Sequence, residues 1–167
     1  MKTIKTAIAL FVTLLATTMN AQDKPKSPAE TASGKIGKAT VTINYGAPSV
    51  RDREIWGKLV PFGEVWRAGA NDATTFETDN ALTIDGKELP AGKYSLFVIP
   101  EKDQTATVIF NKESKQWGAY KYDASKDALR VKVKAAESAK TEQLTYKVNA
   151  KGFALSWDKW TIPVTAK

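Results

Sequence analysis

The sequence of 167 residues contains no cysteine and no histidine. These absences exclude a Ser-His-Asp triad, a thiolate nucleophile, a histidine-ligated zinc site and haem ligation by histidine. Without cysteine, the fold also cannot depend on disulfide bonds. The chemistry that remains is that of carboxylate pairs, lysine, tyrosine, arginine and oxygen-only metal sites. We expect no cofactor and no bound metal.

The chain also lacks a concentrated block of charge. Its 25 Lys and Arg residues against 18 Asp and Glu residues give a formal net charge of +7, and the basic residues are scattered. A nucleic-acid-binding protein would carry a basic stripe interleaved with stacking aromatics. We therefore expect no nucleic-acid partner.

The N-terminal segment is typical of a secretory signal peptide. Residues 1–5 carry two lysines, and residues 6–19 are uncharged with an apolar centre. That apolar run is too short to span a bilayer. We predict a signal peptide over residues 1–21, a flexible arm over 22–34 and a single domain over 35–167. After removal of the signal peptide, we expect no integral membrane segment and a periplasmic or extracellular location.

Alternating apolar and polar residues predict strands in the rest of the chain. The clearest examples are residues 38–45 (KATVTINY) and 128–134 (ALRVKVK). The Asp85-Gly86 pair is a tight-turn signal, and a second turn is predicted at Asp158-Lys159. Short strands between turn signals predict an all-β fold, a single β-sandwich of the jelly-roll or immunoglobulin-like kind with long loops at one end. We expect eight or nine mostly antiparallel strands, at residues 38–45, 74–78, 81–84, 93–99, 105–110, 128–134, 143–148, 153–157 and 160–164.

The most irregular stretch is the 59–75 segment, LVPFGEVWRAGANDATT. One interpretation is a ligand clamp, in which Trp66 stacks on a ring and Arg67 binds a carboxylate or phosphate. Asn71 would add an amide to this clamp, with Glu64 beside it. The other interpretation is a structural corner, in which Trp66 closes the end of the core and Arg67 with Glu64 satisfies loop carbonyls.

Two further loops carry candidate binding residues. Trp117 and Tyr120 lie in a polar loop around Gly118, where exposed aromatics would stack on sugar rings. The alternative is that Trp117 covers the core. Arg51 and Arg53 could hold an anion on the 49–54 loop, or they could form local ion pairs in solvent.

Carboxylates close to the 59–75 segment allow a second kind of chemistry. Two of them could cleave a glycosidic bond if they were about 5 to 9.5 Å apart across a cleft. An oxygen-only calcium site is another option, although the spacing motif of a calcium loop is absent. The alternative is that all of them are solvated loop acids. The four residues are Glu64, Asp72, Glu77 and Asp79.

Four sequence blocks together resemble a known family. They are VTINYG at residues 41–46 with PSV at 48–50, LVPFGEVWRAGAN at 59–71 with ATT at 73–75, LPAGKYSL at 89–96 and QWG at 116–118. The chain resembles the secreted bacterial domain-of-unknown-function family numbered 2911 over about residues 27–134. The resemblance implies a secreted β-sandwich whose biochemical role is unassigned, and it brings no catalytic residues.

We therefore predict a non-catalytic protein that binds a glycan or a small anionic molecule at one end of the domain. The 59–75 segment and the 116–122 loop would form the site, with the 49–54 loop alongside. One alternative is a carboxylate-based glycan hydrolase that uses Glu64 and Asp72. Another is a structural or assembly module of the cell envelope.

Overall fold

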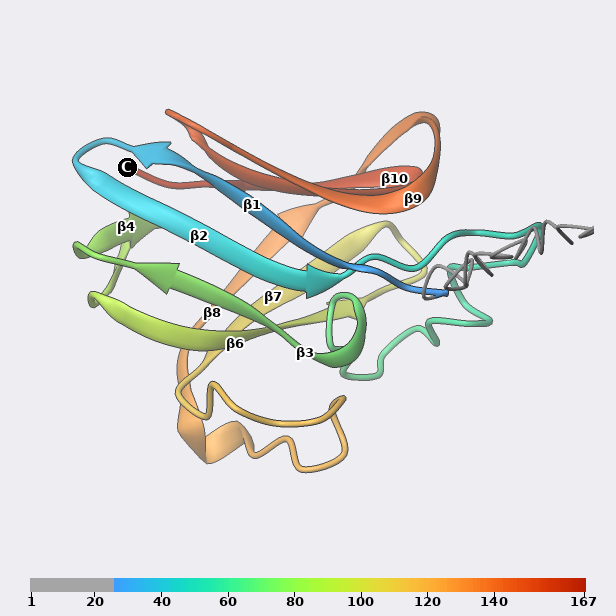
Figure 1. Cartoon of the computed structure of the whole chain (residues 1–167), viewed down its shortest axis with the longest axis horizontal. Helices are drawn as coiled ribbons and strands as arrows, with labels where there is room; N and C mark the ends of the chain where they lie inside the picture. The colour runs from blue at the N-terminus through green and yellow to red at the C-terminus, as the bar shows by residue number, and fades with distance from the viewer. Residues whose placement is uncertain (1–25) are drawn as a thin grey trace, which may run out of the picture.

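The computed structural model describes residues 26–167, so the predicted signal peptide lies outside the described residues. No helix of this part is long and apolar enough to cross a membrane. Residues 26–167 form an all-β domain of ten antiparallel strands and one 3-10 helix (Figure 1). The elements are β1 (Ala29–Ile36), β2 (Ala39–Gly46), β3 (Ala70–Thr78), β4 (Leu82–Ile84), β5 (Lys87–Leu89), β6 (Gly92–Pro100), β7 (Thr105–Asn111), η1 (Ala124–Lys126), β8 (Asp127–Lys134), β9 (Ala136–Asn149) and β10 (Gly152–Thr165).

Within the described residues, six strands form the main sheet, in the order β1-β2-β3-β6-β7-β8. The long hairpin β9–β10 lies over one face of this sheet, at the top of Figure 1. The small hairpin β4–β5 joins the end of β10, because Ile84 bridges Ala166 and the Thr83 amide donates to the carbonyl of Lys167.

The main core lies between the six-stranded sheet and the β9–β10 hairpin. In β2 the side chains of Val41, Ile43 and Tyr45 are buried, while those between them are exposed or half-buried, as the alternation predicted. Aromatic rings meet across the two layers: the centroids of Phe76 and Phe153 are 5.2 Å apart. Burial of such rings is a large favourable contribution to folding.

Two sequence-based expectations about the strands are wrong. The arm predicted over residues 22–34 does not extend past Pro28, because β1 pairs with β2 from Ala29 to Ile36. The turn predicted at Asp158-Lys159 does not exist, since β10 is continuous there. Asp158 instead has a φ of +51° between two register shifts of the β9–β10 pair, which is a β-bulge.

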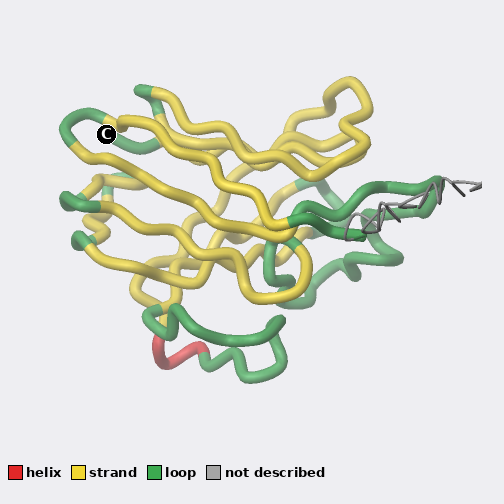
Figure 2. Tube along the Cα trace, viewed as in Figure 1, coloured by secondary structure: helices red, strands yellow, loops and turns green. Residues whose placement is uncertain are grey.

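The outer face of the main sheet carries a smaller apolar cluster. Ala73, Phe97 and Ile109 are buried on this face, beneath Ala119 and Tyr122 of a loop that crosses it. This 112–126 loop connects β7 to β8 and lies beneath the sheet in Figure 2, where the long loops gather at the right end and on the underside. The fold thus places the 112–126 loop beside the end of the 59–75 segment, where Asp72 bridges Trp117.

Candidate functional site

The centre of the 59–75 segment is a buried corner. Ala68 is fully buried with a φ of +53°, and its carbonyl accepts hydrogen bonds from the hydroxyls of Thr74 (3.0 Å) and Tyr146 (2.8 Å). Gly69 has no room for a side chain, because a Cβ there would lie 2.7 Å from Thr74 Oγ1 and 3.0 Å from the carbonyl oxygen of Gly46. Burial raises the pKa of Tyr146 well above its ordinary value, so this hydroxyl stays a donor. The corner is held by its own buried hydrogen bonds.

Trp66 belongs to a group of packed tryptophans. Its ring stacks on Trp157, with centroids 5.7 Å apart, and meets the edge of Trp56 at 5.8 Å. Trp56 in turn stacks on Trp160 at 4.6 Å. Trp66 also pairs through its backbone with Val98 of β6. One face of the Trp66 ring therefore packs against other tryptophans inside the protein, which agrees with the structural-corner interpretation of the 59–75 segment.

The 59–75 segment and the 112–126 loop lie side by side, as the sequence predicted. Asp72 bridges Trp117, the amide of Ala73 donates to the carbonyl of Gln116 (3.0 Å), and the amide of Gly118 donates to the carbonyl of Asn71 (3.2 Å). The loop thereby extends the sheet by a short strand-like stretch beside β3. This pairing fixes the position of Trp117 relative to the corner.

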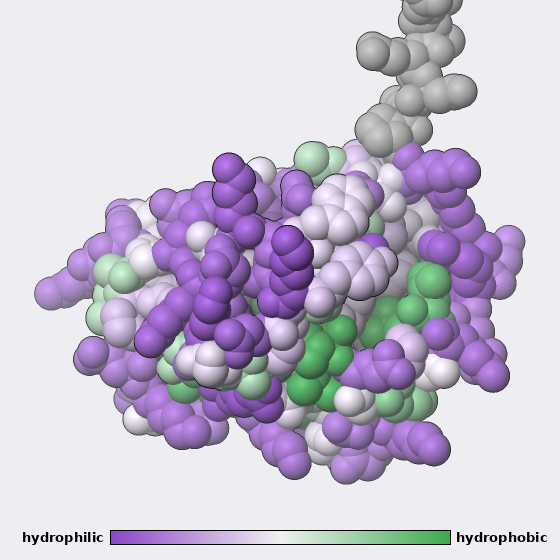
Figure 3. All heavy atoms as spheres, turned by 90° about the horizontal axis from the view of Figure 1, so that it is seen from below, coloured by the Kyte–Doolittle hydropathy of each residue, from purple (hydrophilic) through white to green (hydrophobic). Residues whose placement is uncertain are grey.

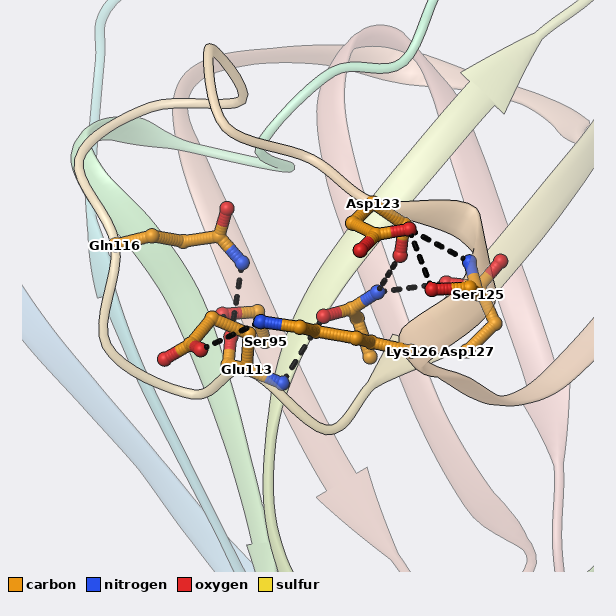
Figure 4. A network of polar contacts seen from close by, with 8 residues as sticks. Ser95, Glu113, Gln116, Asp123, Ser125, Lys126 and Asp127 are labelled. Carbon is orange, nitrogen blue, oxygen red and sulfur yellow. Dashed lines mark hydrogen bonds and ion pairs between the residues drawn. The ribbon is translucent and has the colours of Figure 1, made fainter.

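A buried polar network anchors the 112–126 loop, and sequence reasoning missed it (Figure 4). The Asn111 amide is fully buried and donates to the Asp123 carbonyl (2.9 Å) and to Asp127 Oδ1 (2.8 Å). At the other end of the loop, the Ser95 hydroxyl donates to the carbonyl of Glu113 (2.7 Å). The Asp123-Ala-Ser125 spacing was a usable turn signal, since the Asp123 carboxylate accepts from both the amide and the hydroxyl of Ser125. These hydrogen bonds lower the pKa of Asp123.

Tyr122 is the second anchor of the loop. Its hydroxyl donates to Asp127 Oδ2 (2.6 Å). This carboxylate oxygen of Asp127 also accepts a hydrogen bond from Arg130 Nε (2.6 Å). Its ring meets the edge of Phe97 at 5.1 Å on the outer face of the sheet. Burial raises the pKa of Tyr122, and the hydrogen bond to Asp127 acts in the same direction. Hydrogen bonds therefore hold the 112–126 loop against the sheet at both of its ends.

Trp117 and Tyr120 point outward from the 112–126 loop. Their side chains are 61% and 84% exposed, and among the described residues only Leu59 joins them as an exposed large hydrophobic side chain. They share a groove of about 510 Å³. Figure 3 views the molecule from the side of the 112–126 loop, where pale and green residues lie within a largely hydrophilic surface. The lining residues are Glu113, Lys115, Gln116, Trp117, Tyr120, Lys121 and Lys126.

Arg67 lines a second cavity of about 260 Å³, which shares Tyr120 with the groove. Glu64 and Ala119 also border it. Arg67 and Glu64 form no ion pair within 4.0 Å, and the buried Nε of Arg67 has no hydrogen-bond partner among the described residues. The described structure therefore contains no Glu64–Arg67 ion pair.

Asn71 and Asp72 face a different place. Both line a cavity of about 370 Å³ beside β1 and β2, and the Asn71 amide donates to the carbonyl of Ser27 (3.3 Å). Asn71 also has a φ of +65°, a conformation that asparagine tolerates better than most residues. Glu64 and Asp72 line separate cavities, so neither cavity contains the facing carboxylate pair that the hydrolase hypothesis requires. The described residues contain no group of three or more acidic residues that could hold a metal ion.

Arg51 and Arg53 both donate to backbone carbonyls of the protein. Arg53 donates to the carbonyls of Val50 (3.0 Å) and Ser49 (2.6 Å), and Arg51 donates through Nη2 to the carbonyl of Lys26 (2.9 Å). The 49–54 loop comes after β2 in the chain and lies beside β9, where Ser49 bridges Gln143. Neither arginine lines the groove or the Arg67 cavity. The 49–54 loop therefore does not join the site at Trp117.

Comparison with known proteins gives one finding. A family model described as "Protein of unknown function (DUF2911)" matches residues 27–166. Curated proteins and solved structures give no match. The match begins two residues before β1 and ends one residue after β10, so it covers all ten strands of the described domain. The chain belongs to this family of proteins of unknown function.

Proposed function

We propose that this protein is an exported, non-catalytic glycan-binding protein with a β-sandwich-type domain. Sugar rings stack on Trp117 and Tyr120 in the groove of the 112–126 loop. The observation that carries the proposal is the exposure of these two rings, 61% and 84%, on the wall of one groove. Large aromatic side chains are costly to leave in water, and a pair of them beside polar groups is the usual chemistry of a site for a ring-shaped polar ligand.

The rigidity of the loop supports the same proposal. Asn111, Tyr122 and Asp127 hold the loop from beneath, and its backbone pairs with residues 71–73. A fixed loop loses little conformational freedom when a ligand binds, which favours affinity. Polar side chains with hydrogen-bonding capacity, Gln116 and Lys121 among them, border the aromatic rings and suit sugar hydroxyls.

Binding to a panel of neutral and acidic oligosaccharides tests the proposal. We expect at least one oligosaccharide to raise the melting temperature, and Trp117→Ala to weaken its binding by about tenfold or more, as removal of a central aromatic contact does. Leu59→Ala is the matched control, because Leu59 is also exposed but does not line the groove. If no glycan of the panel binds, or if Trp117→Ala and Leu59→Ala behave alike, the proposal is wrong.

A further inference from the structure

Arg67 differs from the other arginines of the chain. The sequence has four, and three of them donate hydrogen bonds to oxygens of the protein: Arg51 to Lys26, Arg53 to Ser49 and Arg130 to Asp127. The Arg67 side chain donates to no oxygen among the described residues. A guanidinium is charged at all ordinary pH values, and a half-buried one without an acceptor is energetically unfavourable. The folded chain therefore leaves one buried N–H of this charged group, at Nε, without an acceptor among the described residues.

The position of Arg67 connects it to the groove. A Cβ on Gly118 would lie 3.0 Å from two carbons of the Tyr120 ring and 3.7 Å from Arg67 Nη1, so both side chains lie against Gly118. Gly118 has a φ of +62°, which turns the chain here and leaves space for both. Tyr120 borders the groove on one side and the Arg67 cavity on the other. A ligand on the aromatic rings is thus next to the guanidinium.

Charges around the groove favour an anion. Lys115, Lys121 and Lys126 line it against a single carboxylate, Glu113, which is paired with Lys126 at 3.1 Å. Glu64 borders the Arg67 cavity and is exposed, so its charge is screened by solvent. The groove and cavity together carry more positive than negative side chains.

From these observations, and resting on the proposed glycan-binding function, we propose that the ligand is an acidic glycan. Arg67 receives its carboxylate or sulfate group in the cavity beside Tyr120, while the sugar ring stacks on Trp117 and Tyr120. The planar guanidinium forms two parallel hydrogen bonds with a carboxylate or sulfate, and no lysine of the groove can provide that geometry.

A matched pair of ligands tests the proposal: an oligogalacturonate and its fully methyl-esterified form, which differ in charge and not in ring stereochemistry. We expect the wild-type protein to bind the acid about tenfold or more tightly than the ester, because hydrogen bonds to charged groups are the stronger kind. Arg67→Gln is expected to abolish that preference while retaining binding of the ester. Lys132→Ala, which removes an exposed charge from β8 outside the groove, is the control and should leave the preference intact.

The outcomes separate this proposal from the one on which it rests. Equal binding of acid and ester by the wild type, or an unchanged preference in Arg67→Gln, overturns the acidic ligand and leaves glycan binding standing. Failure of both ligands to bind overturns the acidic ligand, whereas absence of binding across the whole oligosaccharide panel, or insensitivity of all binding to Trp117→Ala, overturns both proposals. If Arg67→Gln does not fold, Arg67→Lys decides, since it keeps the charge without the planar fork and should lose most of the preference. Sedimentation with anionic phospholipid vesicles that depends on Trp117 and Arg67, without oligosaccharide binding, would show a membrane-docking loop and also overturn the proposal.

Discussion

Tyr146→Phe combined with Thr74→Val removes both hydroxyls that bind the carbonyl of Ala68. The two substitutions keep the shape of their side chains, and both residues are buried, Thr74 fully and Tyr146 to 3% exposure. The described structure gives that carbonyl two hydrogen bonds, of 3.0 and 2.8 Å, and both come from these side chains. The double variant therefore leaves a buried acceptor with no partner.

The expected magnitudes follow from what each variant leaves behind. Each single substitution removes one hydrogen bond and leaves the other, so each should lower the free energy of unfolding by about 1 kcal/mol. The double variant adds the desolvation cost of an unpaired carbonyl, about 1 to 3 kcal/mol. The total loss should then be about 3 to 5 kcal/mol, larger than the sum of the single losses.

Urea unfolding of the wild type, both single variants and the double variant measures this coupling. Independent sites add to within about 0.5 kcal/mol, so a coupling of about 1 kcal/mol or more is resolvable. Additive losses, or single variants as stable as the wild type, would refute the view that buried hydroxyls hold the corner. Retention of glycan binding by the folded variants would further separate the corner from the site at Trp117.

Three other predictions use different parts of the structure. Trp66→Ala should lower the free energy of unfolding by about 3 kcal/mol in urea titrations, because it opens a cavity against Trp157. An equally large loss in Trp117→Ala would contradict the view that Trp66 is packed inside the protein and Trp117 is exposed. The free energy of unfolding should fall as pH rises above about 10, the ordinary tyrosine pKa, because unfolding lets Tyr146 ionise. The raised pKa of Tyr146 in the folded state contributes its full stabilisation below about pH 10 and loses it above. Tyr146→Phe should therefore reduce the fall in the free energy of unfolding at alkaline pH. An equally steep fall in this variant would contradict the prediction. Gly118→Ala should lower the free energy of unfolding by about 1 to 2 kcal/mol, because alanine is strained at a positive φ, and it should weaken glycan binding because the new Cβ displaces Tyr120. Gly86→Ala is the control: Gly86 has a φ of +72° and no atom within 4 Å of the added Cβ, so only the free energy of unfolding should fall.

Much of the fold was predictable because the sheet buries one face of most strands. Burial of alternate residues in β2 and in the first part of β8 left a period of two in the sequence. β1 was missed because it is an edge strand that buries little apart from Ile36, so its sequence AETASGKI carries no apolar alternation. The first half of β9 is also largely exposed, which hid its length. Asp158-Lys159 has the composition of a turn, yet pairing with β9 on both sides makes it a bulge.

The proximity of the two candidate segments was predictable, whereas the directions of their side chains were not. The sequence indicated that the 59–75 segment and the Trp117 loop lie together, because both break the strand pattern between neighbouring strands. It could not indicate which aromatic rings point inward, since Trp66 meets Trp157 only through long-range packing. Arg51 donates to the carbonyl of Lys26, and the Asn111 amide donates to Asp127, which follows the 112–126 loop. These two contacts join residues that are far apart in the sequence, so they depend on the tertiary fold and leave no local signature.

The five tryptophans provide the most direct test of the account, because each gives one indole N–H signal in a nitrogen–proton correlation spectrum. Titration with the oligosaccharide that binds in the panel should shift the signal of Trp117, identified by its loss in Trp117→Phe. The signals of the packed group, Trp56, Trp66, Trp157 and Trp160, should stay nearly unchanged. A ligand that shifts Trp66 or its packed neighbours while Trp117 stays still would contradict the account and return the site to the 59–75 corner.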